Sequence, residues 1–142
     1  MKFAALPRRL LSLNWLRRRP EDRAALGRRG ERAAARFLRR RGFRVLIRDY
    51  HCPFAQIDMI ASQGEWIVFI EVKTRRTEEN VLSREDVSPT QRERIERAAK
   101  YFVHAHQVTN RPVRFDVLRV IWPVRGNPKI EHIEDAWQAQ LT

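Results

Sequence analysis

Several features that would place a protein in a known class are scarce or missing from this sequence. Cys52 is the only cysteine among 142 residues, which excludes an intrachain disulfide and a cysteine-based zinc site. No Gly-rich phosphate loop, nucleophile elbow or His-Glu-x-x-His motif occurs. The apolar run at residues 10–16 is interrupted by Asn14 and is too short for a transmembrane span or a signal peptide. We therefore expect a cytoplasmic protein in a reducing compartment.

Negative charge is also scarce. Lys and Arg outnumber Asp and Glu by 29 to 17, which gives a formal net charge of +12. Most of the excess is arginine, whose planar guanidinium suits phosphate, so a polyanionic partner is expected. Nucleic acid is the leading candidate because neutralising its phosphates releases counterions, although an anionic membrane would satisfy the same charge. Charge alone does not separate these two partners.

The length fits one domain with a sizeable core. Residues 1–20 are rich in Leu and Arg and contain no acidic residue, so we interpret them as an N-terminal arm. This arm fits an amphipathic helix that touches a membrane or partner, a basic tail that follows phosphates, or a poorly ordered terminus. Residues 21–137 are predicted to form the folded domain and residues 138–142 a short tail.

Hydrophobic periodicity predicts an α/β fold in the order helix, three strands, helix, and one or two strands. The first helix begins near Glu21 and ends before Gly42. The second begins at Ser88 as N-cap, with Pro89 in the first turn and Gln91 placed to close a capping box. The predicted strands cover residues 43–48, 56–61, 66–73, 113–122 and 129–133. The strand at 66–73 is almost continuously apolar, which indicates a central strand covered on both faces.

Three charged residues interrupt two of these apolar strands: Asp58 in one, and Glu71 and Lys73 in the next. Burying a charge is costly unless it is paired or bound to a metal. A two-residue loop at 63–64 would set Gln56 opposite Glu71. Asp58 would then be the diagonal neighbour of Glu71, and both would lie on the same face of the sheet as Lys73. A four-residue loop keeps this parity, whereas a three-residue loop or a bulge reverses the face of Asp58.

Two carboxylates next to an ammonium suit Mg²⁺ or Mn²⁺ chemistry on a phosphodiester. Asp58 and Glu71 are predicted to hold the ion, Lys73 to orient the attacking water or stabilise developing charge, and Glu31 to act as a further ligand. The alternative is a simple ion pair of Glu71 with Lys73 or Arg75, which is the commoner explanation of an isolated Glu-x-Lys tripeptide.

Several ordered motifs of this sequence resemble the uncharacterised bacterial family UPF0102 (YraN) over about residues 26–137. They are GRRGERAA at 27–34, QIDMI at 56–60, VFIEVKTR at 68–75 and RFDV at 114–117. The family resembles the restriction-endonuclease-like, PD-(D/E)XK superfamily, so the resemblance implies a central mixed sheet flanked by helices. It also implies that the D-(x)n-E-x-K signature falls on Asp58, Glu71 and Lys73, which are the residues that strand parity selects.

The sequence departs from that family at two positions of the expected site. The family usually has glutamate where Gln56 stands and lysine where Gln91 stands. Gln56 is therefore predicted to support the catalytic carboxylates without a charge of its own. The resemblance leaves two functions open, a Mg²⁺-dependent nuclease and a non-catalytic nucleic-acid-binding module with a weakened metal site. An adaptor that docks through the N-terminal arm is a third.

Basic residues near the expected site are predicted to hold the nucleic acid backbone as phosphate clamps. The predicted nucleic-acid-binding residues are Arg28, Arg32, Arg75, Arg76 and Gln91. Nothing in the sequence indicates recognition of base edges, so we expect binding directed by shape rather than by sequence. DNA is expected as the partner in preference to RNA, and a membrane partner is not expected.

Overall fold

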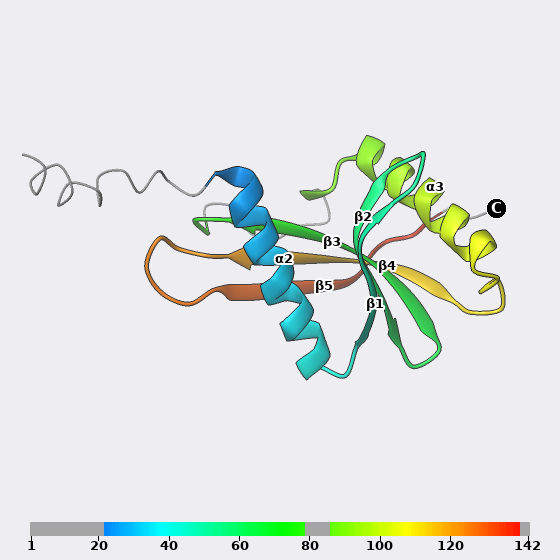
Figure 1. Ribbon diagram of the computed structural model, residues 1–142, viewed down its shortest axis with the longest axis horizontal. Coiled ribbons are helices and arrows are strands. Elements are labelled where there is room, and N and C mark those ends of the chain that lie inside the picture. The colour runs from blue at the N-terminus through cyan, green and yellow to red at the C-terminus, as the bar shows by residue number, and fades with distance from the viewer. Residues whose placement is uncertain (1–21, 79–85, 140–142) are drawn as a thin grey trace, which may run out of the picture.

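The computed structural model describes residues 22–78 and 86–139, in which a five-stranded mixed sheet lies between two helices (Figure 1). The predicted N-terminal arm lies outside the described residues. The elements are α2 (Arg23–Arg40), β1 (Arg44–His51), β2 (Gln56–Gln63), β3 (Trp66–Arg75), α3 (Pro89–Ala105), β4 (Val113–Ile121) and β5 (Lys129–Trp137). Neither described helix is long and apolar enough to cross a membrane. The predicted α/β class and element order are confirmed, with two strands after the second helix.

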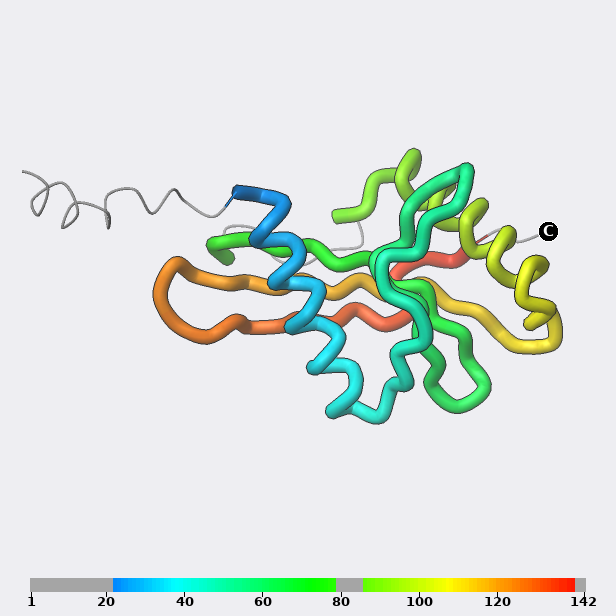
Figure 2. The backbone as a smooth tube through the Cα atoms, in the orientation of Figure 1, coloured from blue at the N-terminus to red at the C-terminus, as the bar shows by residue number. Residues whose placement is uncertain are grey.

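The strands lie in the order β1-β2-β3-β4-β5, so the apolar β3 is the central strand, as predicted. Neighbouring strands are antiparallel except β3 and β4, which are parallel and are therefore joined by a crossover through α3. The hairpin of β4 and β5 extends away from α3 (Figure 2). The last strand runs to Trp137, beyond the predicted end at residue 133, because its pairing with β4 resumes after a register shift.

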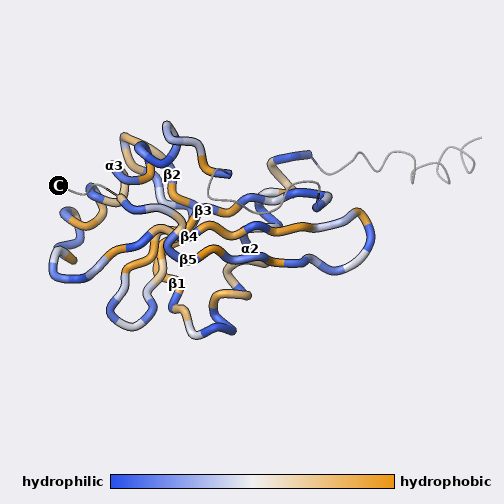
Figure 3. Tube along the Cα trace, turned by 180° about the vertical axis from the view of Figure 1, so that it is seen from behind, coloured by the Kyte–Doolittle hydropathy of each residue, from blue (hydrophilic) through white to orange (hydrophobic). Residues whose placement is uncertain are grey.

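Each face of the sheet packs on one helix. On the α3 face, Phe102 of the helix packs with Phe69 and Phe115 of the two central strands. On the α2 face, Leu38 packs with strand residues that include Val68 and Leu118. Apolar segments run along β3 and β4 through the middle of the sheet (Figure 3). Because residues alternate between the two faces, the side of each polar strand residue follows from its position.

The hairpin turn differs from the predicted one by one residue. Gln63 pairs with Trp66, so the two-residue turn is Gly64 and Glu65 rather than residues 63–64. Gly64 has φ +56°, a backbone conformation that glycine adopts without strain. The turn still contains two residues, so the predicted parity holds. The pairing partners shift by two, however, and the predicted placement of Gln56 opposite Glu71 is wrong.

Gly30 sets the distance between α2 and the sheet. A Cβ atom at this position would lie 1.8 Å from Oγ1 of Thr74, so any larger residue would push the helix off β3. The helix itself begins at Asp22, whose carboxylate accepts a hydrogen bond from the Ala25 N–H at 2.7 Å. The close packing at Gly30 brings the next residue, Glu31, towards the end of β2.

Candidate active site

Asp58 and Glu71 come together where β2 separates from β3. The backbone pairing of the two strands begins at Met59 with Ile70, and one further step along each strand sets Asp58 beside Glu71. Asp58 Oδ2 accepts a hydrogen bond from the Val72 N–H at 2.8 Å, and the Glu71 carboxylate is close enough to raise the pKa of Asp58. The expectation that Asp58 and Glu71 share a face of the sheet is therefore confirmed, with closer neighbours than the predicted register allowed.

The surroundings of Asp58 disfavour its charged form. Burial raises the pKa of this carboxyl to about 7, and the adjacent Glu71 carboxylate acts in the same direction. The Val72 N–H and the Lys73 ammonium oppose this shift but do not cancel it. The positive groups around Asp58 and Glu71 are therefore too few to keep both carboxyl groups ionised at low cost.

Glu71 belongs to a compact set of polar contacts with Lys73 and Gln91. Glu71 is only 8% exposed, and its Oε1 accepts from Gln91 Nε2 at 2.8 Å and lies 3.2 Å from Lys73 Nζ. The same ammonium donates to Gln91 Oε1 at 3.2 Å. The Gln91 amide at the start of α3 therefore bonds to both the Glu71 carboxylate and the Lys73 ammonium.

The contacts of Gln91 correct the predicted capping box. Ser88 is the N-cap, and its hydroxyl accepts from the Gln91 backbone N–H at 3.2 Å, as predicted. The Gln91 side chain, however, extends to Glu71 and Lys73. The Gln91 backbone bonds to the Ser88 cap, whereas its side chain bonds to the charged residues Glu71 and Lys73 of β3.

Glu31, the predicted further ligand, lies within electrostatic reach of Asp58. Burial raises the pKa of Glu31, and the carboxylates of Asp58 and Asp49 add to that effect, while Arg48 and Arg28 oppose it. Asp49 did not stand out in the sequence. It has φ +56° in the irregular strand β1, and no local sequence pattern predicts this backbone conformation.

Gln56 is turned towards β1 rather than towards Glu71. Its Nε2 donates a hydrogen bond to Asp49 Oδ1, and its backbone pairs with His51 at the end of the hairpin. Gln56 therefore contacts the acidic surroundings of Glu31 and is not in contact with the Glu71–Lys73 pair in the described structure. Its predicted supporting role is indirect in this arrangement.

A groove of about 620 Å³ runs between the N-terminal end of α2 and the end of β3. Lys73, Arg75 and Arg76 line it together with Arg23 of α2, so its wall is rich in positive charge. Arg75 donates to the Thr74 carbonyl at 3.0 Å, and Arg76 donates to the Trp122 carbonyl at 3.3 Å. Two of the predicted phosphate-binding residues thus line a groove that begins at Lys73.

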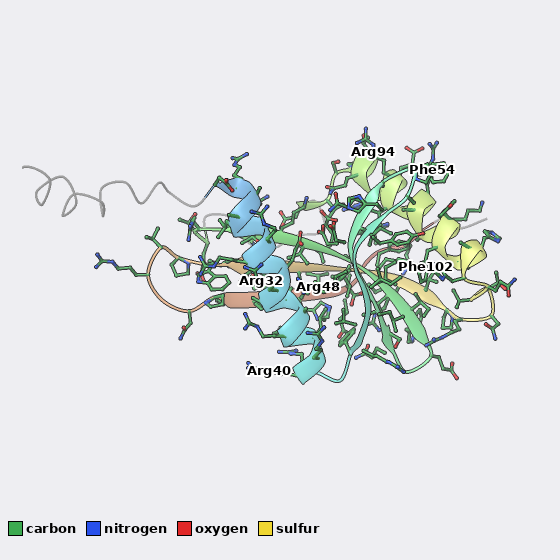
Figure 4. The ribbon with its side chains drawn as sticks, viewed as in Figure 1. Arg32, Arg40, Arg48, Phe54, Arg94 and Phe102 are labelled. Carbon is green, nitrogen blue, oxygen red and sulfur yellow. The ribbon has the colours of Figure 1, made fainter. Side chains whose placement is uncertain are left out.

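The other two predicted arginines, Arg28 and Arg32, are exposed on α2 on either side of Glu31. Arg28 is close enough to lower the pKa of Glu31. Arg32 is visible on the outer surface of α2, on the same side of the molecule as Arg48 of β1 (Figure 4). These residues extend positive charge around the acidic groups.

Arg119 is a residue of this region that the sequence reasoning missed. It pairs in register with Lys73 and follows Val117 by two positions, so it shares the α3 face with Lys73. Arg119 is only 4% exposed, and none of the hydrogen bonds or ion pairs among residues 22–78 and 86–139 involves its guanidinium. A charge within the apolar second half of the strand, residues 117–121, was the available signal, but its neighbour on the next strand was unknown.

The simpler interpretation, an ion pair within the Glu-x-Lys tripeptide, describes part of this arrangement. Glu71 and Lys73 do form a close pair, whereas Arg75 bonds to a carbonyl of its own strand. That pair does not account for Asp58, which adds a second acidic group to Glu71 at a cost. An ion pair alone would be better served by an apolar residue at position 58.

Comparison with known sequences assigns the family. The profile of the uncharacterised protein family UPF0102 matches residues 30–120. The chain belongs to the UPF0102 family. The UPF0102 protein of Geotalea uraniireducens is 37% identical over 123 residues, covering 84% of this chain and 97% of the relative. That of Pelotomaculum thermopropionicum is 36% identical over 118 residues, covering 82% and 98%. That of Moorella thermoacetica is 44% identical over 91 residues, covering 64% and 76%.

The carboxylates of this UPF0102 chain fit a small divalent cation in their chemistry. Asp58 and Glu71 offer hard oxygen donors, and a cation between them would relieve the mutual repulsion that raises the pKa of Asp58. The described residues contain no group of three or more His, Cys, Asp or Glu side chains arranged around one point. Mg²⁺ is commonly bound through one or two carboxylates, with waters and substrate phosphates as the other ligands.

Proposed function

We propose that this UPF0102 protein is a Mg²⁺- or Mn²⁺-dependent nuclease with a restriction-endonuclease-like core. The observation that carries the proposal is the contact between Asp58 and Glu71, with Lys73 at 3.2 Å from Glu71. This acidic pair lies in a chain of net charge +12, beside a groove lined by arginines. Carboxylates concentrated in a basic protein favour a metal-assisted reaction on a polyanion.

Each group has a role that follows from its position. Asp58 and Glu71 would hold the cation, which when bound polarises the phosphodiester and lowers the pKa of a bound water. The Lys73 ammonium is held by Glu71 and Gln91, so it would stabilise negative charge that develops on the phosphoryl oxygens. Arg119 would contribute a second positive charge on the same face.

The nucleic acid would approach along the basic groove. Arg75 and Arg76 line it next to Lys73, while Arg28 and Arg32 extend positive charge over α2. Contacts of this kind fix the position of a phosphate backbone without reading base edges. The proposal is therefore for binding without sequence specificity, with DNA as the preferred partner.

The second candidate is a non-catalytic nucleic-acid-binding module of the same fold. It is favoured by the contacts of Gln56 and Gln91, since one amide bonds to Asp49 and the other occupies both Glu71 and Lys73. This module would bind nucleic acid with strong salt dependence, and neither divalent metal nor Asp58→Asn would change its affinity. The predicted adaptor role rests on residues 1–20, and deletion of that arm with loss of partner association remains its test.

The nuclease proposal is tested by incubating the purified protein with branched, single-stranded and duplex DNA and RNA in Mg²⁺ or Mn²⁺. Glu71→Gln and Lys73→Met should each reduce cleavage by about 100-fold or more, since each removes a charge at the reacting groups. Glu65→Gln, an identical change at an exposed position of the hairpin turn, is the control and should cleave like the wild type. Absence of metal-dependent cleavage, or cleavage that survives both active-site variants, would contradict the proposal.

A further inference from the structure

Phe54 and Tyr101 form an exposed aromatic pair away from the carboxylates. Phe54 lies in the turn between β1 and β2 and is 47% exposed, and Tyr101 lies on α3 and is 43% exposed. Their ring centroids are 5.9 Å apart with planes at 66°, an edge-to-face contact. Each ring therefore keeps a large part of its apolar surface in water, which is unfavourable unless a ligand covers it.

The pair is not needed to attach the hairpin to the helix. Tyr50 of β1 already packs edge-to-face on Phe102 of α3, with centroids 5.5 Å apart. Ile57, which follows Phe54 by three residues, is buried in the core on this side of the sheet. The structural connection of β1, β2 and α3 is therefore complete beneath the exposed rings.

Basic side chains surround the two rings. Arg97, Lys100 and His104 line the shallow depression that Phe54 and Tyr101 share. One acidic residue is nearby, because Arg97 forms an exposed ion pair with Glu93 at 3.3 Å. The depression thus combines aromatic faces with a rim that carries mostly positive charge.

The depression connects to the candidate active site along α3. Gln91, Arg94, Arg97 and Tyr101 follow one another at helical spacing of three and four residues, so they lie along one side of the helix. Ten residues of helix separate Gln91 from Tyr101, a rise of about 15 Å. Arg94 of α3 and Phe54 of the turn lie at the same edge of the molecule (Figure 4). A nucleic acid strand leaving the carboxylates in this direction would pass exposed arginine before it reached the rings.

We propose that Phe54 and Tyr101 stack against unpaired bases of a nucleic acid strand, while Arg94, Arg97 and Lys100 contact its phosphates. The inference rests on the proposed function and specifies its substrate class, a nucleic acid with a single-stranded segment next to the position of cleavage. Aromatic rings in a basic groove suit such a strand because every base presents a π-face. Bases that are paired inside a duplex cannot reach the rings, so the interior of a duplex gains nothing from them.

The experiment measures the affinity of the full-length protein for three labelled ligands by fluorescence anisotropy, in EDTA so that no cleavage occurs. The ligands are a single strand, a blunt duplex, and the same single strand with abasic positions. Phe54→Ala and Tyr101→Ala should each weaken single-strand binding by about tenfold and leave duplex binding within about twofold of the wild type. Tyr101→Phe keeps the ring and should keep the affinity.

Trp66→Leu is the matched control, because Trp66 is a similarly exposed aromatic residue, 41% accessible, at the far end of β3 from Lys73. It should bind all three ligands like the wild type. The abasic strand should bind the wild type about tenfold more weakly than the intact strand, and the two alanine variants should lose most of that difference. Thermal midpoints of all variants report whether folding is preserved.

Equal weakening for single strand and duplex, or no weakening for either, would overturn the proposal. Unchanged binding together with a change of oligomeric state in Phe54→Ala would also overturn it, since the rings would then serve self-association. The measurement is independent of catalysis. Loss of base-dependent binding in these variants would support the stacking surface whatever the result of the cleavage assay. If Glu71→Gln then left cleavage unaffected, only the nuclease proposal would fail.

Discussion

Asp116 and the partly buried Asp58, two aspartates of the same sheet, have very different hydrogen-bond partners. Asp116 of β4 is fully buried, and its carboxylate accepts from Arg114 Nε at 3.0 Å, His132 Nε2 at 2.8 Å and the Asp135 N–H at 2.9 Å. Burial alone would raise the pKa of Asp116, but the hydrogen bonds from His132, Arg114 and the Asp135 N–H outweigh it and lower the pKa. The charged form of Asp116 is therefore the stable one.

Asp58 has the opposite balance. It accepts one backbone hydrogen bond from Val72 and lies against a second carboxyl group, and its pKa is raised to about 7. A carboxylate whose partners are complete stabilises the fold, whereas one held beside another acid has a reason to bind a cation. The difference separates a structural cluster, made by Arg114, Asp116 and His132, from the candidate active site.

The largest effect on stability is expected from breaking the structural cluster. Asp116→Ala should lower the free energy of unfolding by about 3–5 kcal/mol, because it leaves Arg114 and His132 without their buried anion. Urea denaturation measures this change. Glu134→Gln is the control, since Glu134 is half exposed and lies 3.9 Å from Arg114, and it should cost less than about 0.5 kcal/mol. A loss below about 1 kcal/mol for Asp116→Ala would remove the distinction drawn between the two aspartates.

Asp58→Asn should act in the opposite direction in metal-free protein. The folded pKa of Asp58 is about 7, above its ordinary value of 3.8, so wild-type stability is lost as the pH rises from about 4 to about 7. The asparagine variant has no such loss and can still accept from the Val72 N–H. At pH 8 in EDTA it should be more stable than the wild type by up to about 4 kcal/mol, with little difference below pH 4.

Urea denaturation at both pH values, with and without Mn²⁺, checks this expectation. Mn²⁺ should raise the thermal midpoint of the wild type at pH 8 and have much less effect on Asp58→Asn, because the variant lacks one anionic ligand. Asp116→Asn, compared in the same way, should show no gain at pH 8. An equal stabilisation of Asp58→Asn at all pH values would show that ionisation of Asp58 is not the cause.

A smaller effect is expected at Arg119. Arg119→Met should leave the free energy of unfolding of the ligand-free protein within about 1.5 kcal/mol of the wild type, because no ion pair of its guanidinium is found among residues 22–78 and 86–139. The same change should abolish part of the thermal stabilisation that inorganic phosphate gives the wild type. Arg125→Met, at an exposed position between β4 and β5, is the control for loss of charge. A larger destabilisation by Arg119→Met would mean that the guanidinium has an internal partner.

The smallest effect is expected at Gln91. Gln91→Ala removes the hydrogen bonds to Glu71 and Lys73 but leaves the backbone N–H that Ser88 caps, so it should cost about 0.5–1.5 kcal/mol. Ser88→Ala, which removes the cap itself, is the comparison and should cost about 1 kcal/mol. If the Gln91 side chain served the helix end alone, the two changes together would cost no more than Ser88→Ala. Stability from urea denaturation of the double variant decides between these cases.

Much of the fold and part of the candidate site could be predicted because they depend on local patterns. Ser88 and Pro89 mark the start of α3 through the geometry of a helix N-terminus. The period of two along a strand placed Asp58, Glu71 and Lys73 on one face, and that parity survived an error of one residue in the turn. Any hairpin loop of even length gives the same result.

Local sequence patterns could not predict the register of the strands or the partners of their side chains. The sequence did not reveal that Gln56 of β2 would bond to Asp49 of β1, where the backbone has a positive φ. It did not pair Lys73 with Arg119 either, because these residues lie on two parallel strands that are separated in the chain by the whole of α3. Such contacts join residues far apart in the chain.

The sequence by itself determined the family, the helix starts, the apolar central strand and the shared face of Asp58, Glu71 and Lys73, because hydrophobic periodicity and capping act over a few residues. Only the tertiary structure decided how each charge is satisfied. Asp116 gains partners from β4 and β5, whereas Asp58 gains a second carboxyl group from β3. The energy of a buried charge depends on the few side chains that surround it, and the packing of separate strands chooses them.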